Sequence, residues 1–463
     1  MLLQIIVCIP FITSFPIALD EPFSIFHAQL GLKEMLPELS QGNNAPLHFI
    51  LLNGWTKLFG ISPFAVRSLS LLFGVLAIYP LYKISQKLMN DQSAILVVAL
   101  FIFSRLLHFH YMEARMYGLF ITLFLFILYD LYLIWQTNKF IWWRLGLMNA
   151  ALFATHYLGG VIIGLEVFFL LLILNKLNRK SILFLLLSFG LAFLLVFPII
   201  LDFITRIGDF NANGTWVERP GYSAIPIVIF KFFNNPFGFI FTISFSLVVF
   251  LIHRNVKSLK ENWSKLLFFF YWSAVPFLFF FYFSRIKQPI FLERYMLFII
   301  PVTLILVVYW LYLQLREKRY YWISFIVILP FIAAVKFKPN TNRDPEAAVK
   351  FVKSASSPNS TIAIFPAYYN YTFIYHYNKN WFNANFTSHL SENRIYSIYS
   401  FEDIQLTPTT DQLILIESNG RTFYPNNNVI QDCMNWGIMK NQGTFVGGLN
   451  VYVFEREDST INN

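Results

Sequence analysis

The sequence predicts an α-helical protein that crosses a membrane many times, followed by a small α/β domain. Two observations support this fold class. Of the 463 residues, 57% are hydrophobic and only 13% are charged, whereas soluble proteins contain about 25% charged residues. Apolar runs of about 20 residues, the length of a membrane-spanning helix, recur along the chain as far as residue 336. Beyond that point the runs are short and polar residues increase.

Eleven apolar runs are expected to cross the membrane. They are residues 1–18, 63–82, 92–109, 116–135, 142–157, 158–175, 182–201, 223–251, 266–283, 294–313 and 320–336. A further apolar segment, Leu47–Phe59, has 13 residues, which is too short to span. Because it contains polar residues, we expect a helix that lies at the membrane surface.

The positions of basic residues predict the orientation of these spans. Lys and Arg gather in the connections that face the cytoplasm, and here every second connection is basic if the N-terminus is cytoplasmic. These basic sets are Lys83 and Lys87; Lys139 and Arg144; Lys176, Arg179 and Lys180; Arg254, Lys257, Lys260 and Lys265; and Arg316, Lys318 and Arg319. The net charge of +10 is then explained by cytoplasmic loops and anionic lipid, so we expect no nucleic-acid partner.

The first apolar run, Met1–Ala18, has two interpretations. It ends in small residues, as a secretory signal peptide does. It lacks Lys and Arg and contains Pro10 and Pro16, which favours a short first membrane helix. The two cysteines, Cys8 and Cys433, predict no disulfide framework.

The C-terminal region, residues 337–463, is predicted to form a separate extracytoplasmic α/β domain, and residues 1–336 the membrane domain. Asp344-Pro345 is typical of a helix start, with an N-cap followed by proline at the first helical position. The runs 361–365, 413–417 and 449–455 are rich in β-branched and other apolar residues, which favours strands.

An acidic pair, Asp20–Glu21, follows the first apolar run and opens an outward stretch, residues 19–62. A carboxylate at the membrane boundary can act as a general base toward a hydroxyl group within hydrogen-bond reach. The alternative is a pair of boundary charges that only end a helix. His48 lies in the same stretch and is a candidate for donor binding.

A second cluster, residues 108–118, lies at the outward end of the third span. It contains Glu113 and Arg115, and an arginine near the bilayer surface suits a phosphate through forked, charge-assisted hydrogen bonds. The alternative is an interfacial belt of aromatic and snorkelling side chains. His108 and His110 do not share a helix face, which disfavours a zinc site.

A third cluster, residues 285–295, is basic and also outward. Arg285, Lys287 and Arg294 could hold a lipid-linked phosphate, although contact with ordinary lipid headgroups would explain them equally well. His156 lies in a polar break in an apolar run and is interpreted as a packing residue rather than a ligand.

Four stretches together resemble a known family. They are LDE at 19–21, the segment Asn44–Gly74 with NAPLHF and FAVRSLSLLFG, HYMEARMYG at 110–118 and FLERYMLFIIP at 291–301. In their order and predicted side of the membrane they resemble the GT-C glycosyltransferases of the protein O-mannosyltransferase-like family, which includes bacterial enzymes similar to the aminoarabinose transferase of lipid A. The sequence Asn44-Ala45-Pro46 departs from this pattern, because members usually have two prolines there.

The resemblance implies an integral membrane enzyme of the bacterial plasma membrane that moves a sugar from a polyprenyl-phosphate donor to a glycan, lipid or protein acceptor outside. It implies Asp20 as the catalytic carboxylate and, less directly, Glu21. Such a transfer passes through an oxocarbenium-like transition state, which a carboxylate stabilises, and its departing phosphate needs cations. No cofactor is expected, and a divalent metal stays open. The alternative is a flippase of lipid-linked sugars, which would more often carry charges in mid-membrane.

Overall fold

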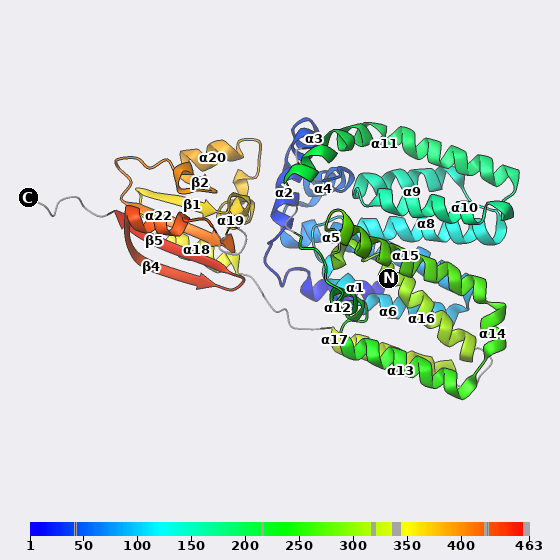
Figure 1. The fold of residues 1–463 in the computed structure, drawn as a ribbon. Coiled ribbons are helices and arrows are strands. Elements are labelled where there is room, and N and C mark those ends of the chain that lie inside the picture. The colour runs from blue at the N-terminus through cyan, green and yellow to red at the C-terminus, as the bar shows by residue number, and fades with distance from the viewer. Residues whose placement is uncertain are drawn as a thin grey trace, which may run out of the picture. The chain divides into compact units, whose positions relative to one another are not determined.

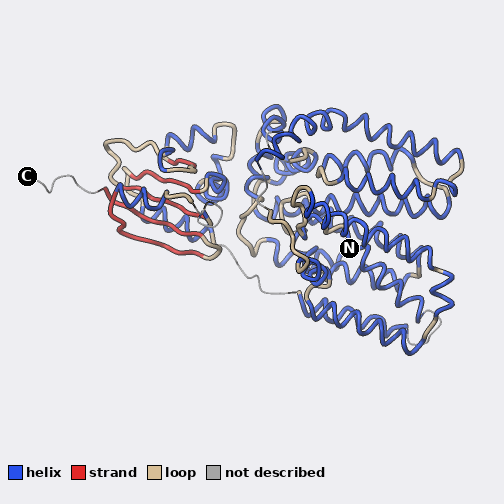
Figure 2. The backbone as a smooth tube through the Cα atoms, in the orientation of Figure 1, coloured by secondary structure: helices blue, strands red, loops and turns tan. Residues whose placement is uncertain are grey.

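A computed structural model describes residues 1–40, 42, 44–213, 217–315, 321–335, 344–420, 424 and 426–456 (Figures 1 and 2). Contacts divide the chain into two units. The first is Met1–Ile12, Leu36–Leu51 and Val66–Phe337, and the second is Thr13–Met35, Leu52–Ala65 and Lys338–Asn463. The first unit is helical, and the second contains the β-sheet.

The helical unit is a bundle of apolar helices joined by short connections. Its helices are α1 (Leu2–Ile12), α5 (Pro63–Leu88), α6 (Asp91–Ile102), α7 (Arg105–Tyr111), α8 (Tyr117–Thr137), α9 (Trp142–Thr155), α10 (Gly159–Leu172), α11 (Arg179–Asn213), α12 (Ala224–Phe232), α13 (Pro236–His253), α14 (Val256–Glu261), α15 (Trp263–Ile286), α16 (Ile299–Leu315) and α17 (Leu329–Ala334), with short 3-10 turns η2 (Glu293–Tyr295) and η3 (Tyr321–Ile328).

Every apolar run predicted to cross the membrane contains a helix, but their lengths differ. In the described part of the chain, five helices are long and apolar enough to cross, namely α5, α8, α11, α13 and α15, and α6 with α7 makes a sixth if this pair, bent by 65°, is one span. The run 223–251 is broken into α12 and α13. The count of eleven crossings and the direction of each therefore stay predictions.

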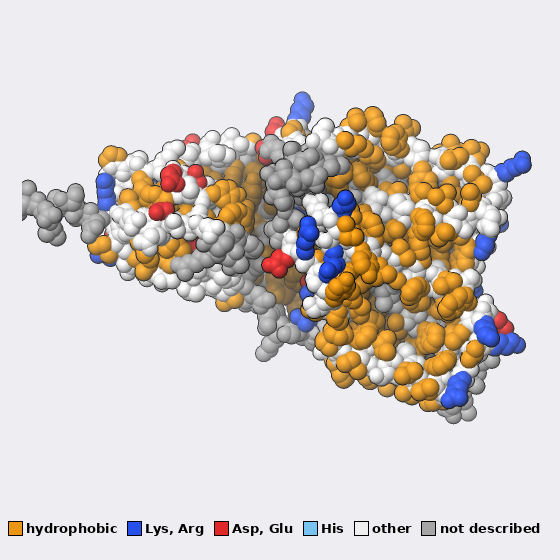
Figure 3. All heavy atoms as spheres, in the orientation of Figure 1, with side chains coloured by type: hydrophobic (Ala, Val, Ile, Leu, Met, Phe, Trp, Pro, Cys, Tyr) orange, Lys and Arg blue, Asp and Glu red, His pale blue; other side chains and the backbone are white. Residues whose placement is uncertain are grey.

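Aromatic side chains fill the interior of this unit. Phe124 of α8 lies 5.8 Å from Trp272 of α15 and 4.9 Å from Phe298, which precedes α16, between ring centroids. All three are buried. In lipid, helices associate through such packing, because apolar surface gains nothing by leaving an apolar solvent. Apolar side chains also cover the sides of these helices, whereas Lys and Arg side chains lie near their ends (Figure 3).

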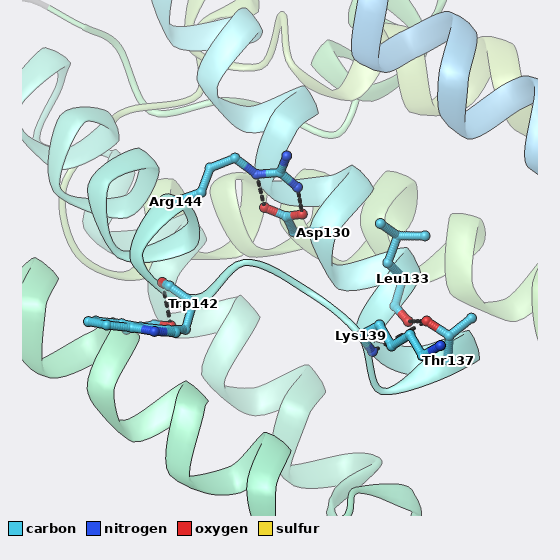
Figure 4. Close-up of polar contacts among 7 residues, drawn as sticks. Asp130, Leu133, Thr137, Lys139, Trp142 and Arg144 are labelled. Carbon is cyan, nitrogen blue, oxygen red and sulfur yellow. Dashed lines mark hydrogen bonds and ion pairs between the residues drawn. The ribbon is translucent and has the colours of Figure 1, made fainter.

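One predicted cytoplasmic cation serves the packing of two helices. Arg144 of α9 forms a forked ion pair with the carboxylate of Asp130 of α8, in which Nε donates to Oδ2 over 3.1 Å and a second nitrogen donates to Oδ1 (Figure 4). Asp130 is fully buried, and a buried charge is costly unless it is paired. Arg144 therefore neutralises Asp130. The basic set Arg316, Lys318 and Arg319 lies outside the described residues.

The predicted outward stretch after Asp20 forms three short helices, α2 (Glu21–Gln29), α3 (Leu32–Ser40) and α4 (Leu47–Phe59). The last one has the predicted bounds, and its place at the membrane surface stays a prediction. Asn53 of α4 donates both amide hydrogens to the C-terminal end of α2. The acceptors are the carbonyl oxygens of Ala28 (2.8 Å) and Leu30 (2.9 Å). This side chain therefore fixes the C-terminal end of α2.

The sheet has five strands in the order β2-β1-β3-β5-β4. Strands β1, β2 and β3 are parallel, and β5 pairs antiparallel with β3 and β4. The predicted runs appear as β1, β3 and β5, while β2 and β4 were not predicted. The elements are α18 (Pro345–Ala355), β1 (Ser360–Phe365), α19 (Asn370–Tyr377), α20 (Phe386–Glu392), β2 (Ile395–Ser397), β3 (Gln412–Ser418), α22 (Val429–Trp436), β4 (Gly437–Phe445) and β5 (Leu449–Arg456).

Helix α18 begins as the sequence indicates. Asp344 is its N-cap, and its carboxylate accepts a hydrogen bond from the Ala347 amide at 3.0 Å. Such a cap satisfies one of the unpaired amides of the first turn. The small sheet region predicted for the C-terminal part is confirmed, whereas its limits at residue 337 and its location outside the membrane stay predictions.

Within the sheet-containing unit, the helix that follows Asp20 packs against α19. The ring of Phe26 lies 4.8 Å from that of Tyr371. Two hydrogen bonds join α19 to the same early segments: Tyr375 Oη donates to the Ile61 carbonyl and His376 Nε2 lies 2.7 Å from the Ile17 carbonyl oxygen. The C-terminal residues thus support the segment that leads into Asp20.

Candidate active site

Arg115 lies in the turn between α7 and α8, and its backbone is held by α5. The hydroxyl of Ser70 on α5 donates to the Arg115 carbonyl at 2.9 Å. Gly118 allows this approach, because a Cβ there would lie 2.6 Å from the Ser70 carbonyl oxygen. The side chain of Arg115 is 8% exposed. A buried arginine in such a fixed turn is a costly feature that is typical of a binding site.

His48, in the first turn of α4, is buried beside this arginine. It is 1% exposed. Burial lowers its pKa to about 3, and the positive charge of Arg115 lowers it further, while the Ala114 backbone opposes this. His48 is therefore neutral at physiological pH, so the positive charge here belongs to Arg115.

Arg294, which lies in η2, is also near this turn. His156 lies in the break between α9 and α10, outside both helices. Its ring lies within electrostatic reach of both Arg115 and Arg294. The His156 ring lies 5.2 Å from that of Tyr295. We call His48, Arg115, His156 and Arg294 the arginine cluster.

The two acidic side chains near the arginine cluster have partners of their own. Glu113 lies 2.6 Å from Nδ1 of His110, and Glu293 lies 2.6 Å from Nζ of Lys231. Burial alone would raise the pKa of Glu293, but the hydrogen bond and charge of Lys231 hold that pKa below its usual value. Because Glu293 is paired with Lys231, it offsets less of the charge of the two arginines.

The other two predicted cations are placed differently. Arg285 stacks on Tyr222, with Cζ 4.3 Å from the ring centroid, and donates to the Pro220 carbonyl at 3.1 Å. Lys287 is exposed at the C-terminal end of α15. In the part of the chain that the structure describes, no contact joins either residue to the arginine cluster, so of the predicted cations only Arg115 and Arg294 come together.

Asp20 and Glu21 lie in the other unit, at the start of α2. Asp20 is the N-cap of this helix and is partly exposed, whereas Glu21 is 4% exposed. The preceding residue, Leu19, has φ +62°. This left-handed conformation is costly for a side chain with a Cβ and is often found at functional sites. Asp20 therefore follows a strained residue and is reachable from solvent.

The arginine cluster and the segment that contains Asp20 determine the possible chemistry. Arg115 and Arg294, beside the neutral imidazole of His48, suit a phosphate group through forked hydrogen bonds. Among the described residues, no three His, Cys, Asp or Glu side chains converge as metal ligands. The sequence singled out His156 as a polar break in an apolar run and favoured a packing role, and its contact with Tyr295 leaves that interpretation a prediction.

Residues 43–201 match the family described as dolichyl-phosphate-mannose-protein mannosyltransferase. The fold is similar to that of ArnT from Cupriavidus metallidurans in the apo state, with a TM-score of 0.60 and 12% identity over 98% of this chain and 96% of that one. ArnT bound to undecaprenyl phosphate gives a TM-score of 0.52 at 12% identity, over 100% of this chain and 98% of that one.

No curated protein matches this sequence. The family match over residues 43–201 agrees with the resemblance predicted from the sequence, and at 12% identity the likeness to the solved structures shows the fold alone. The matched segment contains His48, Arg115 and His156, while Asp20 and Arg294 lie outside it. The roles of these residues stay predictions.

Proposed function

We propose that this protein is a membrane glycosyltransferase that moves a sugar from a polyprenyl-phosphate donor to an acceptor hydroxyl at the outer face of a bacterial plasma membrane. The observation that carries the proposal is the arginine cluster, in which Arg115 is buried in a turn held by Ser70, and Tyr295, the neighbour of Arg294, contacts His156. A similar fold is seen in an ArnT structure described as bound to undecaprenyl phosphate, which supports the same class of lipid here.

The donor phosphate is the leaving group in this proposal. When the bond between the anomeric carbon and the phosphate oxygen breaks, negative charge grows on the phosphate. Arg115 and Arg294 stabilise that charge by direct, charge-assisted hydrogen bonds. His48 remains neutral and acts as a hydrogen-bonding group rather than as a further cation.

An apolar groove in the helical unit suits the prenyl chain. Its volume is about 610 Å³, and it lies between α13, α15 and α16. Its lining includes Leu247, Phe250, Trp263, Phe270, Leu306 and Trp310. The prenyl chain leaves other apolar chains of the bilayer for this groove, so the groove adds donor affinity through close packing rather than through the hydrophobic effect.

Asp20 is proposed as the catalytic carboxylate. The acceptor oxygen forms the new bond to the anomeric carbon, its proton passes to Asp20, and polyprenyl phosphate departs with the electron pair of the broken bond. A carboxylate near the anomeric carbon also stabilises the oxocarbenium-like transition state. Glu21, which is buried in the first turn of α2, is proposed to position Asp20.

The test is a transfer assay with the purified full chain. Radiolabelled polyprenyl-phosphate sugars are offered with a crude envelope acceptor, and Asp20→Asn is compared with Glu38→Gln, an exposed carboxylate in α3. We expect transfer by the wild type and Glu38→Gln, and none by Asp20→Asn. Transfer at the wild-type rate by Asp20→Asn would refute the catalytic assignment, and uptake of donor into proteoliposomes without transfer would refute the proposed reaction.

A further inference from the structure

The sheet carries a pocket away from the arginine cluster. It lies at the carboxyl ends of the parallel strands β1 and β3, where Phe365 ends β1 and the chain after β3 supplies Tyr424, Asn428, Gln431 and Met434. From β1 the chain continues toward β2 on one side, and from β3 it continues toward β5 on the other. Such a switch point between parallel strands is where open α/β sheets bind ligands.

Two aromatic rings form the apolar surface of this pocket. The ring of Phe365 lies over Gly420, where a Cβ would be 2.1 Å from its Cε1 atom, so only glycine leaves room for this ring. The ring of Tyr424 follows at 6.0 Å and is 37% exposed. The two rings are inclined by 52° and Phe365 is buried, so the ring of Tyr424 is the apolar surface that the pocket opens to solvent.

Amide side chains supply its polar surface. Asn427 is used by the fold, because it donates to the Tyr399 carbonyl and accepts from the Val429 amide at 2.8 Å. Asn428 and Gln431 also line the pocket, and Gln431 is exposed. An amide group both donates and accepts hydrogen bonds, which matches a hydroxyl group.

The size and charge of the pocket narrow the ligand class. Its volume is about 220 Å³, below the range of about 300–1,000 Å³ that holds drug-sized ligands. None of the described residues that line it is charged. A neutral ring that stacks on Tyr424 and carries several hydroxyl groups fits these described lining residues.

The same end of the sheet leads to the catalytic segment. Six residues after Phe365, Tyr371 packs against Phe26 of α2, the helix that Asp20 caps. We propose that the pocket binds a neutral sugar ring of the acceptor. This inference rests on the proposed transfer reaction, and it gives the sheet a role in acceptor choice.

Binding is tested on the full chain in detergent, without donor, by saturation-transfer NMR with methyl glycosides of neutral hexoses. The wild type is expected to show transfer to at least one glycoside. Gln431→Ala should weaken binding about fivefold through loss of one hydrogen bond, and Met434→Trp should abolish it by filling the pocket. Gln442→Ala, an exposed amide on β4, should bind as the wild type does.

Each outcome decides the inference. Equal binding by Gln431→Ala, Met434→Trp and the wild type, or no transfer of saturation to any glycoside, would overturn it. Asp20→Asn is included because it should bind the glycoside normally. If sugar transfer fails while glycoside binding depends on the pocket, the proposed reaction is wrong and the pocket stands. If sugar transfer succeeds while the pocket variants bind the glycoside as the wild type does, the proposed reaction stands and the pocket inference is wrong.

Discussion

Lys231 Nζ lies 2.6 Å from Oε1 of Glu293, and this ion pair joins α12 to the short helix that carries Arg294. The two residues are 62 positions apart in the chain. Their pairing matters for the arginine cluster, because Glu293 is the direct neighbour of Arg294. Without Lys231, the negative charge of Glu293 would reduce the positive electrostatic potential that attracts the donor phosphate.

The first prediction concerns this pair. Lys231→Gln is expected to raise the KM for the polyprenyl-phosphate donor about fivefold, with little change in stability, because partly exposed ion pairs contribute about 0–1 kcal/mol. Removing the carboxylate as well, in Lys231→Gln with Glu293→Gln, should restore the KM. If the double variant is no better than the single one, Glu293 does not oppose donor binding.

The second prediction is a loss of stability in acid. The pKa of His48 is lowered to about 3 by burial first and by the charge of Arg115 second, whereas unfolded histidine titrates near about 6.5. Between these values the unfolded chain binds more protons. Stability is therefore complete above pH ~6.5 and falls as the pH decreases toward about 3.

Thermal unfolding in detergent from pH 7.5 to pH 4.5 measures this effect. The slope of stability against pH should be smaller in His48→Gln than in the wild type, whatever the absolute stability of the variant. Parallel slopes in the two proteins would show that His48 takes up a proton in the folded state as readily as in the unfolded one.

The third prediction concerns the close approach of α5 and α8. Gly118→Ala places a Cβ 2.6 Å from the Ser70 carbonyl oxygen, and such overpacking typically costs about 1–3 kcal/mol. We expect a lower unfolding temperature and a higher donor KM, because the Arg115 backbone must shift. Gly164→Ala on α10 is the matched control, since a Cβ there meets nothing within 4 Å.

The fourth prediction concerns the support of Asp20. Asn53→Leu removes two hydrogen bonds to the end of α2, at a cost of about 2 kcal/mol. The kcat for transfer should fall while the donor KM stays the same, and proteolysis should reach residues 19–35 sooner. Asn393→Ala, an exposed amide, serves as the control, and an unchanged kcat in Asn53→Leu would exclude a positioning role.

The fifth prediction concerns the apolar groove. Leu247→Trp narrows the groove and should raise the KM for a long-chain donor about tenfold, because the larger ring displaces part of the chain and its packing contacts are lost. A short-chain donor should be used as before. Leu251→Trp, one turn further along α13 and outside the groove lining, should leave both KM values unchanged.

The sequence predicts the helical class and several boundaries because these depend on local signals. Leu47–Phe59 is too short and too polar to cross, and Asp344-Pro345 starts a helix by capping alone. Strand β4 was not predicted. Most of its side chains are exposed, so its sequence lacks the apolar residues that indicate a strand. Pairings between distant residues, such as Lys231 with Glu293, depend on tertiary packing and cannot be read from spacing.

Single carboxylates inside apolar runs gave a signal that was not used. Asp130 and Glu166 each interrupt a predicted span, and both are fully buried. A carboxylate inside a span requires a partner, but the sequence does not show which residue that partner is. The structure pairs Asp130 with Arg144, and Glu166 Oε1 accepts from Asn149 at 3.3 Å.

The ion pair between Asp130 and Arg144 also bears on how the protein is made. An aspartate within a span opposes insertion, by up to about 3 kcal/mol at the centre of the helix. Asp130 lies in the C-terminal half of α8, and α8 leaves the ribosome before α9. Since Arg144 follows Asp130 by 14 residues, the translocon can receive both charges before α8 passes into lipid. Helices α8 and α9 would then enter the bilayer as one hairpin. In a chain cut between them, α8 would have to insert without the partner of Asp130.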